Sequence, residues 1–121
     1  MYRELANKYR KDNPLKIIEV AATEISPEVK FYLKELNAGE KMHLFYVFDN
    51  DLKTATEDDR MLYALNMMLC DHDGDRTEKA ENYSYLCDLP HTLLQRLLQE
   101  AIKLISVEPE VKKSLVQSTD S

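Results

Sequence analysis

Glycine and tryptophan are nearly missing from this chain of 121 residues, which has two glycines and no tryptophan. An all-β sandwich or barrel needs a turn signal every few residues, and two glycines supply too few. The scarcity also excludes catalytic frameworks that cradle phosphates in glycine-rich loops. Hydrophobic residues make up 44% of the sequence and charged residues 31%, which is typical of a globular domain. The composition therefore favours one compact, mostly helical domain.

Concentrated positive charge is also lacking. Sixteen Lys and Arg stand against 22 Asp and Glu, which gives a net charge of -6. Residues 1–50 are balanced, so the acidic excess lies within residues 51–121. Proteins that bind DNA or RNA need a dense basic surface, and no stripe of Lys and Arg interleaved with aromatic residues occurs here. We therefore expect no nucleic-acid partner.

Long apolar runs are missing as well. No segment approaches the roughly 18 apolar residues of a membrane-spanning helix, and residues 1–8 are charged where a signal peptide would be apolar. Two cysteines, Cys70 and Cys87, are too few for a disulfide framework. These absences predict a cytoplasmic protein without a membrane partner.

Several local signals predict the elements. Residues 2–11 read as a short polar helix, and residues 16–21 and 29–34 as two strands joined through Ser26-Pro27. Helix starts are predicted at Asn37 with Glu40, and at Thr56. A short helix is predicted over residues 77–86.

The clearest signal is the last helix, which we expect to begin around Asp88-Leu89-Pro90. Its wide apolar stripe comprises Leu93, Leu94, Leu97, Leu98, Ala101, Ile102 and Ile105. We predict a mainly α domain of about four helices with a short N-terminal β-hairpin at about residues 15–35. This single domain spans residues 1–108, and residues 109–121 form a polar, flexible tail.

Metal-binding and catalytic patterns are incomplete. Counted from Asp71 as the first position of a calcium loop, Arg76 stands where glycine is required and Asn82 where glutamate is required. Four potential zinc ligands exist, but their spacing matches no standard zinc module; they are Cys70, His72, Cys87 and His91. They define the alternative interpretation, a small zinc-binding helical regulator. With no phosphate loop and no nucleophile elbow, we predict no enzyme and no cofactor.

Acidic residues concentrate at 49–59 and 71–81, on both sides of one predicted helix, where they can steer a basic partner. Met67 lies off the main apolar stripe of that helix, and methionine adapts well to irregular partner surfaces. The predicted partner-binding residues are Asp71, Asp73, Asp75, Glu78 and Met67. A homo-oligomer is also expected, because so small a domain can bury part of its leucine stripe between subunits.

Two segments together resemble the tail assembly chaperones of long-tailed, siphovirus-like bacteriophages and prophages. Residues 29–41, with Phe45 beyond, are similar to that family's strand ending in Lys-Glu-Leu and followed by a helix start. Residues 62–106 are similar to its order of apolar helix, Asp-Gly turn, acidic connector and leucine-rich last helix. Departures occur at residues 75–77 and 104–106, where relatives often have Leu-Phe-Thr and Leu-Asn-Gly.

The resemblance implies a non-enzymatic protein of the host cytoplasm that is absent from the mature virion. It further implies that the partner is the tail tube protein, the tape measure protein, or both, held before polymerisation.

Overall fold

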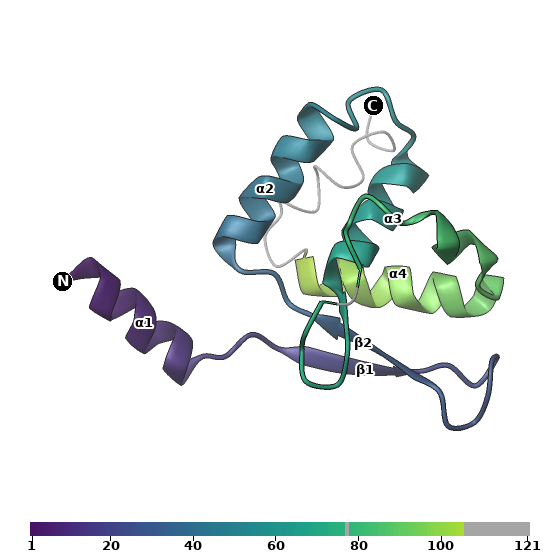
Figure 1. Ribbon diagram of the computed structural model, residues 1–121, viewed down its shortest axis with the longest axis horizontal. Helices are drawn as coiled ribbons and strands as arrows, with labels where there is room; N and C mark the ends of the chain where they lie inside the picture. The colour runs from purple at the N-terminus through teal and green to yellow at the C-terminus, as the bar shows by residue number, and fades with distance from the viewer. Residues whose placement is uncertain (77, 106–121) are drawn as a thin grey trace.

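The computed structural model describes residues 1–76 and 78–105, and shows a small sheet with most of the helices gathered on one side of it and the first helix standing apart (Figure 1). In chain order the elements are α1 (Tyr2–Asp12), β1 (Ile17–Ala21), β2 (Lys30–Lys34), α2 (Ala38–Asp49), α3 (Glu57–Met68), β3 (Leu69–Cys70), the 3-10 helix η1 (Ser84–Asp88) and α4 (His91–Ile105). The described structure is 53% helical and 12% strand, with three antiparallel strands. The predicted mainly α class is therefore wrong, and the class is mixed α/β.

The third strand accounts for the correction. β1 and β2 pair antiparallel as expected, with Ile17 opposite Lys34 and Ala21 opposite Lys30. β3 pairs with the other side of β2, where Leu69 lies opposite Leu33. Leu69 directly follows the last residue of α3, and its backbone is extended (φ -62°, ψ 135°). Pairing with β2 thus ends the helix at Met68 and gives the sheet the order β1-β2-β3.

Two predicted helix starts are confirmed. The Asn37 side chain accepts a hydrogen bond from the Glu40 backbone N–H (2.8 Å), and the Glu40 carboxylate accepts one from the Asn37 N–H (3.0 Å). This reciprocal pair satisfies two N–H groups that a helix start leaves open. At the start of α3, the Thr56 hydroxyl accepts from the Asp59 N–H (3.1 Å).

The connector before the last helix differs from the prediction. Residues 78–83 form no helix, and helical structure resumes only as η1 at Ser84. Asp88 belongs to η1 and does not cap α4, which begins at His91 directly after Pro90. α4 extends to Ile105, the last residue that the structure describes.

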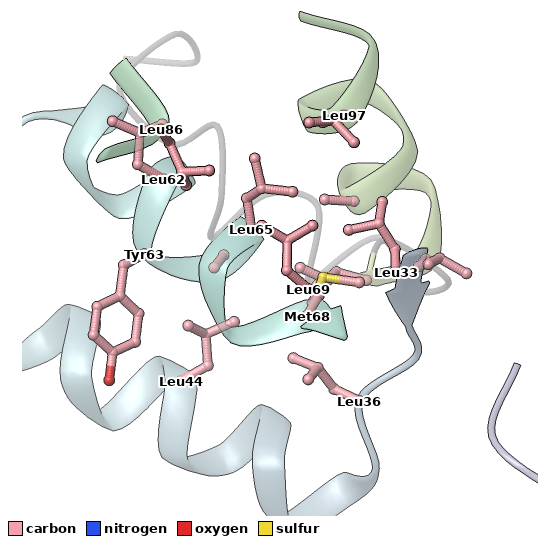
Figure 2. Packing of buried hydrophobic residues seen from close by; sticks show 14 of the residues in the cluster. Leu33, Leu36, Leu44, Leu62, Tyr63, Leu65, Met68, Leu69, Leu86 and Leu97 are labelled. Atoms are coloured by element: carbon pink, nitrogen blue, oxygen red, sulfur yellow. The ribbon is translucent and has the colours of Figure 1, made fainter. Parts of the chain in front are cut away.

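α3 is the central element of the core. It contacts α4, β2 and η1, and six of its twelve residues are buried. Figure 2 shows its apolar side chains meeting Leu44 of α2, Leu33 of β2 and Leu97 of α4. The apolar stripe of α4 is used in the same core, since Leu93, Leu97, Ala101 and Ile105 are buried and Leu94 and Leu98 are partly buried.

One polar side chain lies inside this core. Asn66 of α3 is fully buried, and its amide nitrogen donates to the carbonyl oxygens of Lys79 (2.9 Å) and Ala80 (3.3 Å). Its amide oxygen accepts from the Tyr85 hydroxyl (2.6 Å). These bonds attach the irregular segment 79–85 to α3, because a buried amide without partners would be strongly unfavourable.

A second polar contact attaches the sheet to α4. The Glu24 carboxylate, in the turn between β1 and β2, accepts from the Arg96 guanidinium and from the Thr92 hydroxyl (2.7 Å). Arg96 also donates to the carbonyl oxygen of Ala21 (2.8 Å). The hydrogen bond from Arg96, aided by that from Thr92, lowers the pKa of Glu24 to about 2.

α1 confirms the helix predicted over residues 2–11, but it stands apart from the rest of the molecule at the left of Figure 1. None of its residues is buried.

Among the described residues, no helix is long and apolar enough to cross a membrane. The predicted domain boundary at residue 108 and the tail at 109–121 lie outside the described residues.

Replacing Asn66 with alanine would leave the carbonyls of Lys79 and Ala80 and the Tyr85 hydroxyl without their partner. We expect Asn66→Ala to lower the free energy of unfolding by roughly 2–4 kcal/mol, and Tyr85→Phe by about 1 kcal/mol. Urea denaturation followed by circular dichroism measures both. Asn82→Ala, at an exposed position of the same segment, is the control and should change stability by less than about 0.5 kcal/mol. Equal losses in the Asn66 and Asn82 variants would contradict the role of the buried amide.

The Glu24 contact predicts a pH dependence. Because the pKa of Glu24 is lowered to about 2 in the folded protein, its contribution is present above its ordinary pKa of 4.5 and is lost as the pH falls towards 2. Glu24→Gln should therefore be less stable than the wild type at pH 7, with a difference that shrinks through this acidic range. Thermal unfolding at several pH values measures the effect. Glu28→Gln is the matched control, because Glu28 accepts from Ser26 and forms no ion pair within the described residues. A pH-independent difference for Glu24→Gln would contradict the prediction.

Candidate functional site

The chain leaves β3 through a tight acidic turn, residues 71–75. The Asp71 carboxylate accepts from the backbone N–H groups of Asp73 (2.9 Å) and Asp75 (3.0 Å). The Asp71 N–H in turn donates to the Asp75 carbonyl (2.9 Å). These hydrogen bonds, that with Asp75 most of all, hold the pKa of Asp71 below its ordinary value. Asp71 therefore shapes the turn.

Gly74 fixes this turn against the sheet. It is buried and has a φ of +87°, a conformation that residues with a Cβ rarely adopt. A Cβ at this position would lie 2.9 Å from the Ile17 side chain of β1. The Lys34 ammonium of β2 donates to the Gly74 carbonyl (3.3 Å), so the turn is held by both strands.

The predicted partner-binding residues occupy different environments. Asp73, Asp75 and Glu78 are exposed, and the carboxylates of Asp71, Asp73 and Asp75 lie within 4.8 Å of one another. Met67 is partly buried and packs against the core. Three of the five side chains, Asp73, Asp75 and Glu78, are thus freely presented to a partner.

A recess of about 280 Å³ adjoins this turn at Cys70, the residue before Asp71, and none of residues 71–75 lines it. Its walls are mostly apolar and aromatic, with an ammonium group from β2 and a carboxylate from the connector among them; the lining residues are Lys30, Phe31, Tyr32, Leu69, Cys70, Glu78 and Tyr85. Burial, aided by the nearby Glu78 carboxylate, raises the pKa of Tyr85. Among these residues, the sequence had identified Glu78 as a partner-binding residue and Cys70 as a candidate zinc ligand. It did not identify the aromatic side chains, because they come from segments far apart in the chain.

The cations around the recess are already paired. The Lys30 ammonium contacts the Glu19 carboxylate (2.9 Å), and the Arg76 guanidinium contacts Glu40 (3.1 Å). In residues 1–76 and 78–105, no Lys or Arg forms an ion pair with the four predicted acids; Asp73 contacts only the His72 ring (3.4 Å). The negative charge of Asp73, Asp75 and Glu78 is therefore available to a basic partner.

The four candidate zinc ligands do not gather into a site. Cys70 is a buried free thiol and Cys87 an exposed one. Within the described part of the chain, the one group of three or more potential ligands is Asp71, Asp73 and Asp75. Asp71 already accepts two backbone hydrogen bonds there, and an exposed acidic group alone does not define a metal centre. The arrangement thus gives no support to the zinc-binding alternative.

No protein-family model, curated protein or solved structure matches this chain. The function is therefore inferred from the recess, the acidic turn and the resemblance given by the sequence.

The two thiols should react differently. Burial raises the pKa of Cys70, so little thiolate forms at neutral pH, whereas Cys87 is exposed. We expect one fast-reacting thiol per chain in the native protein at pH 7, measured with a chromogenic disulfide reagent. Cys87→Ser should abolish the fast reaction and Cys70→Ser should retain it; fast labelling of Cys70 would contradict its burial and would point to an activated thiol.

Proposed function

We propose that the protein is a non-enzymatic tail assembly chaperone that holds a tail subunit in the host cytoplasm before polymerisation and is absent from the mature virion. The client is the tail tube protein, the tape measure protein, or both. The observation that carries the proposal is an apolar, aromatic recess beside an acidic turn whose charges are unpaired. The family resemblance over residues 29–41 and 62–106 supplies the identity of the client.

The recess and the turn favour binding of an assembly segment over catalysis. An apolar recess of this size accommodates one or two side chains of a client, and burial of such side chains provides non-directional affinity. The carboxylates of Asp73, Asp75 and Glu78 attract basic residues that flank the same segment. Exposed charges of this kind increase the association rate and the specificity more than the final affinity. Such binding suits a client that must later be released.

The fixed geometry of the acidic turn also suits a holding role. The hydrogen bonds to Asp71 fix the shape of the turn, and the Lys34 ammonium of β2 holds its Gly74 carbonyl, so Asp73 and Asp75 keep their positions without a bound client. A preorganised site binds without the entropic cost of ordering a loop.

Co-expression with the tail tube subunit, followed by size-exclusion chromatography with light scattering, tests the proposal. We expect a soluble mixed complex in which the tube subunit does not polymerise. Asp73→Lys/Asp75→Lys should weaken the complex at least tenfold at low salt, because it reverses the charge beside the recess.

Glu28→Lys/Asp88→Lys is the matched control, since it changes the net charge by the same amount at exposed positions outside the recess and the turn. It should leave the complex intact. If both variants bind as the wild type does, the acidic turn is not the contact. If neither the tail tube nor the tape measure protein forms a complex with the wild type, the proposed function is wrong.

A further inference from the structure

α1 presents an apolar face that none of the other residues in 1–76 and 78–105 buries. Tyr2, Leu5 and Tyr9 are three and four residues apart, so they share one face of the helix. Their exposed fractions are 79%, 58% and 60%. The Arg10 guanidinium lies over the Tyr9 ring, 5.6 Å from its centroid, and gives this face a basic border.

The helix also lacks the means to be stable alone. It has 11 residues, and Met1 at its N-cap makes no side-chain hydrogen bond to it. Isolated helices shorter than about 12–15 residues are marginal in water, and in proteins their stability comes mostly from packing of an apolar face. A helix at residues 2–12 therefore requires a surface to pack against.

The charge of α1 is opposite to that of the remaining chain. Residues 2–12 contain four basic and two acidic side chains, a net charge of +2. Since the whole chain carries -6, the other residues carry -8. This segregation favours contact between α1 and the body of another copy of the same chain.

A groove on the body has the complementary chemistry. It has a volume of about 500 Å³ and lies between α2, α3 and residues 81–83; its lining residues are His43, Val47, Asp51, Leu52, Tyr63, Glu81 and Tyr83. The Tyr63 and Tyr83 rings meet edge to face, 6.3 Å apart. Burial raises the pKa of both tyrosines, and the nearby carboxylates raise it further: Glu81 and Asp51 at Tyr63, and Asp59 at Tyr83. The groove is thus aromatic inside and acidic at its border.

We propose that α1 is an exchanged arm, whose Tyr2, Leu5 and Tyr9 face binds the acidic aromatic groove of a second copy of this chain, and reciprocally. The arm leaves the sheet at β1 through only residues 13–16, and Figure 1 shows it directed away from α2 and α3. Two tyrosines and a leucine bury roughly 400 Å² per arm. Two reciprocal contacts, counted on both surfaces, then bury about 1,600 Å², the size of a standard stable interface.

Sedimentation equilibrium of the full chain over a range of concentrations tests the proposal. We expect a dimer whose dissociation constant rises with salt, because the arm and groove carry opposite charge. Leu5→Ala/Tyr9→Ala should raise that constant at least tenfold while favouring the helix itself, since alanine is the best helix former. Glu4→Ala/Lys11→Ala, on the opposite face of α1 and neutral in net charge, is the matched control and should leave the dimer unchanged.

A mixing experiment separates exchange between copies from folding back within one copy. Asp51→Lys/Glu81→Lys should also weaken the dimer at least tenfold, whereas Glu28→Lys/Asp88→Lys should not. A mixture of the arm variant and the groove variant keeps one intact arm and one intact groove, so it should associate more tightly than either variant alone. A monomeric wild type, a dimer that tolerates both variants, or a mixture no tighter than its components would overturn the proposal. These variants lie outside the recess and the acidic turn, so the result is independent of client binding.

Discussion

The buried amide of Asn66 is the contact on which the functional half of the molecule depends. Between β3 and η1 the described chain has no helix or strand and one isolated bridge, from Cys70 to Arg76, so backbone ladders do not position residues 78–83. Asn66 replaces them with hydrogen bonds to Lys79, Ala80 and Tyr85. Because the Asn66 side chain is fully buried, water could not replace these hydrogen bonds if they broke. Their loss would therefore lower the stability by the full cost of burying unpaired polar groups. A polar residue in the last turn of α3 therefore fixes a segment that its own sequence leaves undetermined.

That segment contributes to two different surfaces. Glu78 and Tyr85 line the recess beside the acidic turn, while Glu81 and Tyr83 line the groove beside α2. Acidic residues therefore lie at both apolar concavities. In each concavity, aromatic rings provide apolar surface and carboxylates provide negative charge. α1 differs from the rest of the described chain in both respects, since it is basic and is exposed along its whole length.

The sequence predicted the elements whose ends are decided locally. The cap at Asn37, the cap at Thr56 and the hairpin strands were recovered, because each depends on side chains within a few residues or on alternation along one strand. β3 was missed because pairing with β2, and no local signal, ends α3 at Met68. The connector was misread for a related reason: its backbone groups bond to Asn66, a residue more than ten positions earlier, and so form no helix over residues 78–83. At the site, the acids were found by their density in the sequence, whereas the aromatic lining of the recess exists only once β2 and the connector are brought together.

The attachment to Asn66 also decides how the two surfaces influence each other. Coupling between two sites requires an element with two arrangements, each preferred by one ligand. Apart from α3 and its flanking residues, the segment from Lys79 to Tyr85 is the only described stretch that lines both the recess and the groove. The buried Asn66 side chain holds this segment at both ends. A segment anchored in this way has one favoured position, so occupation of the recess and occupation of the groove should contribute independent free energies. Substitutions on either side of the connector should then change the recess and the groove separately, whereas a substitution of Asn66 should affect both.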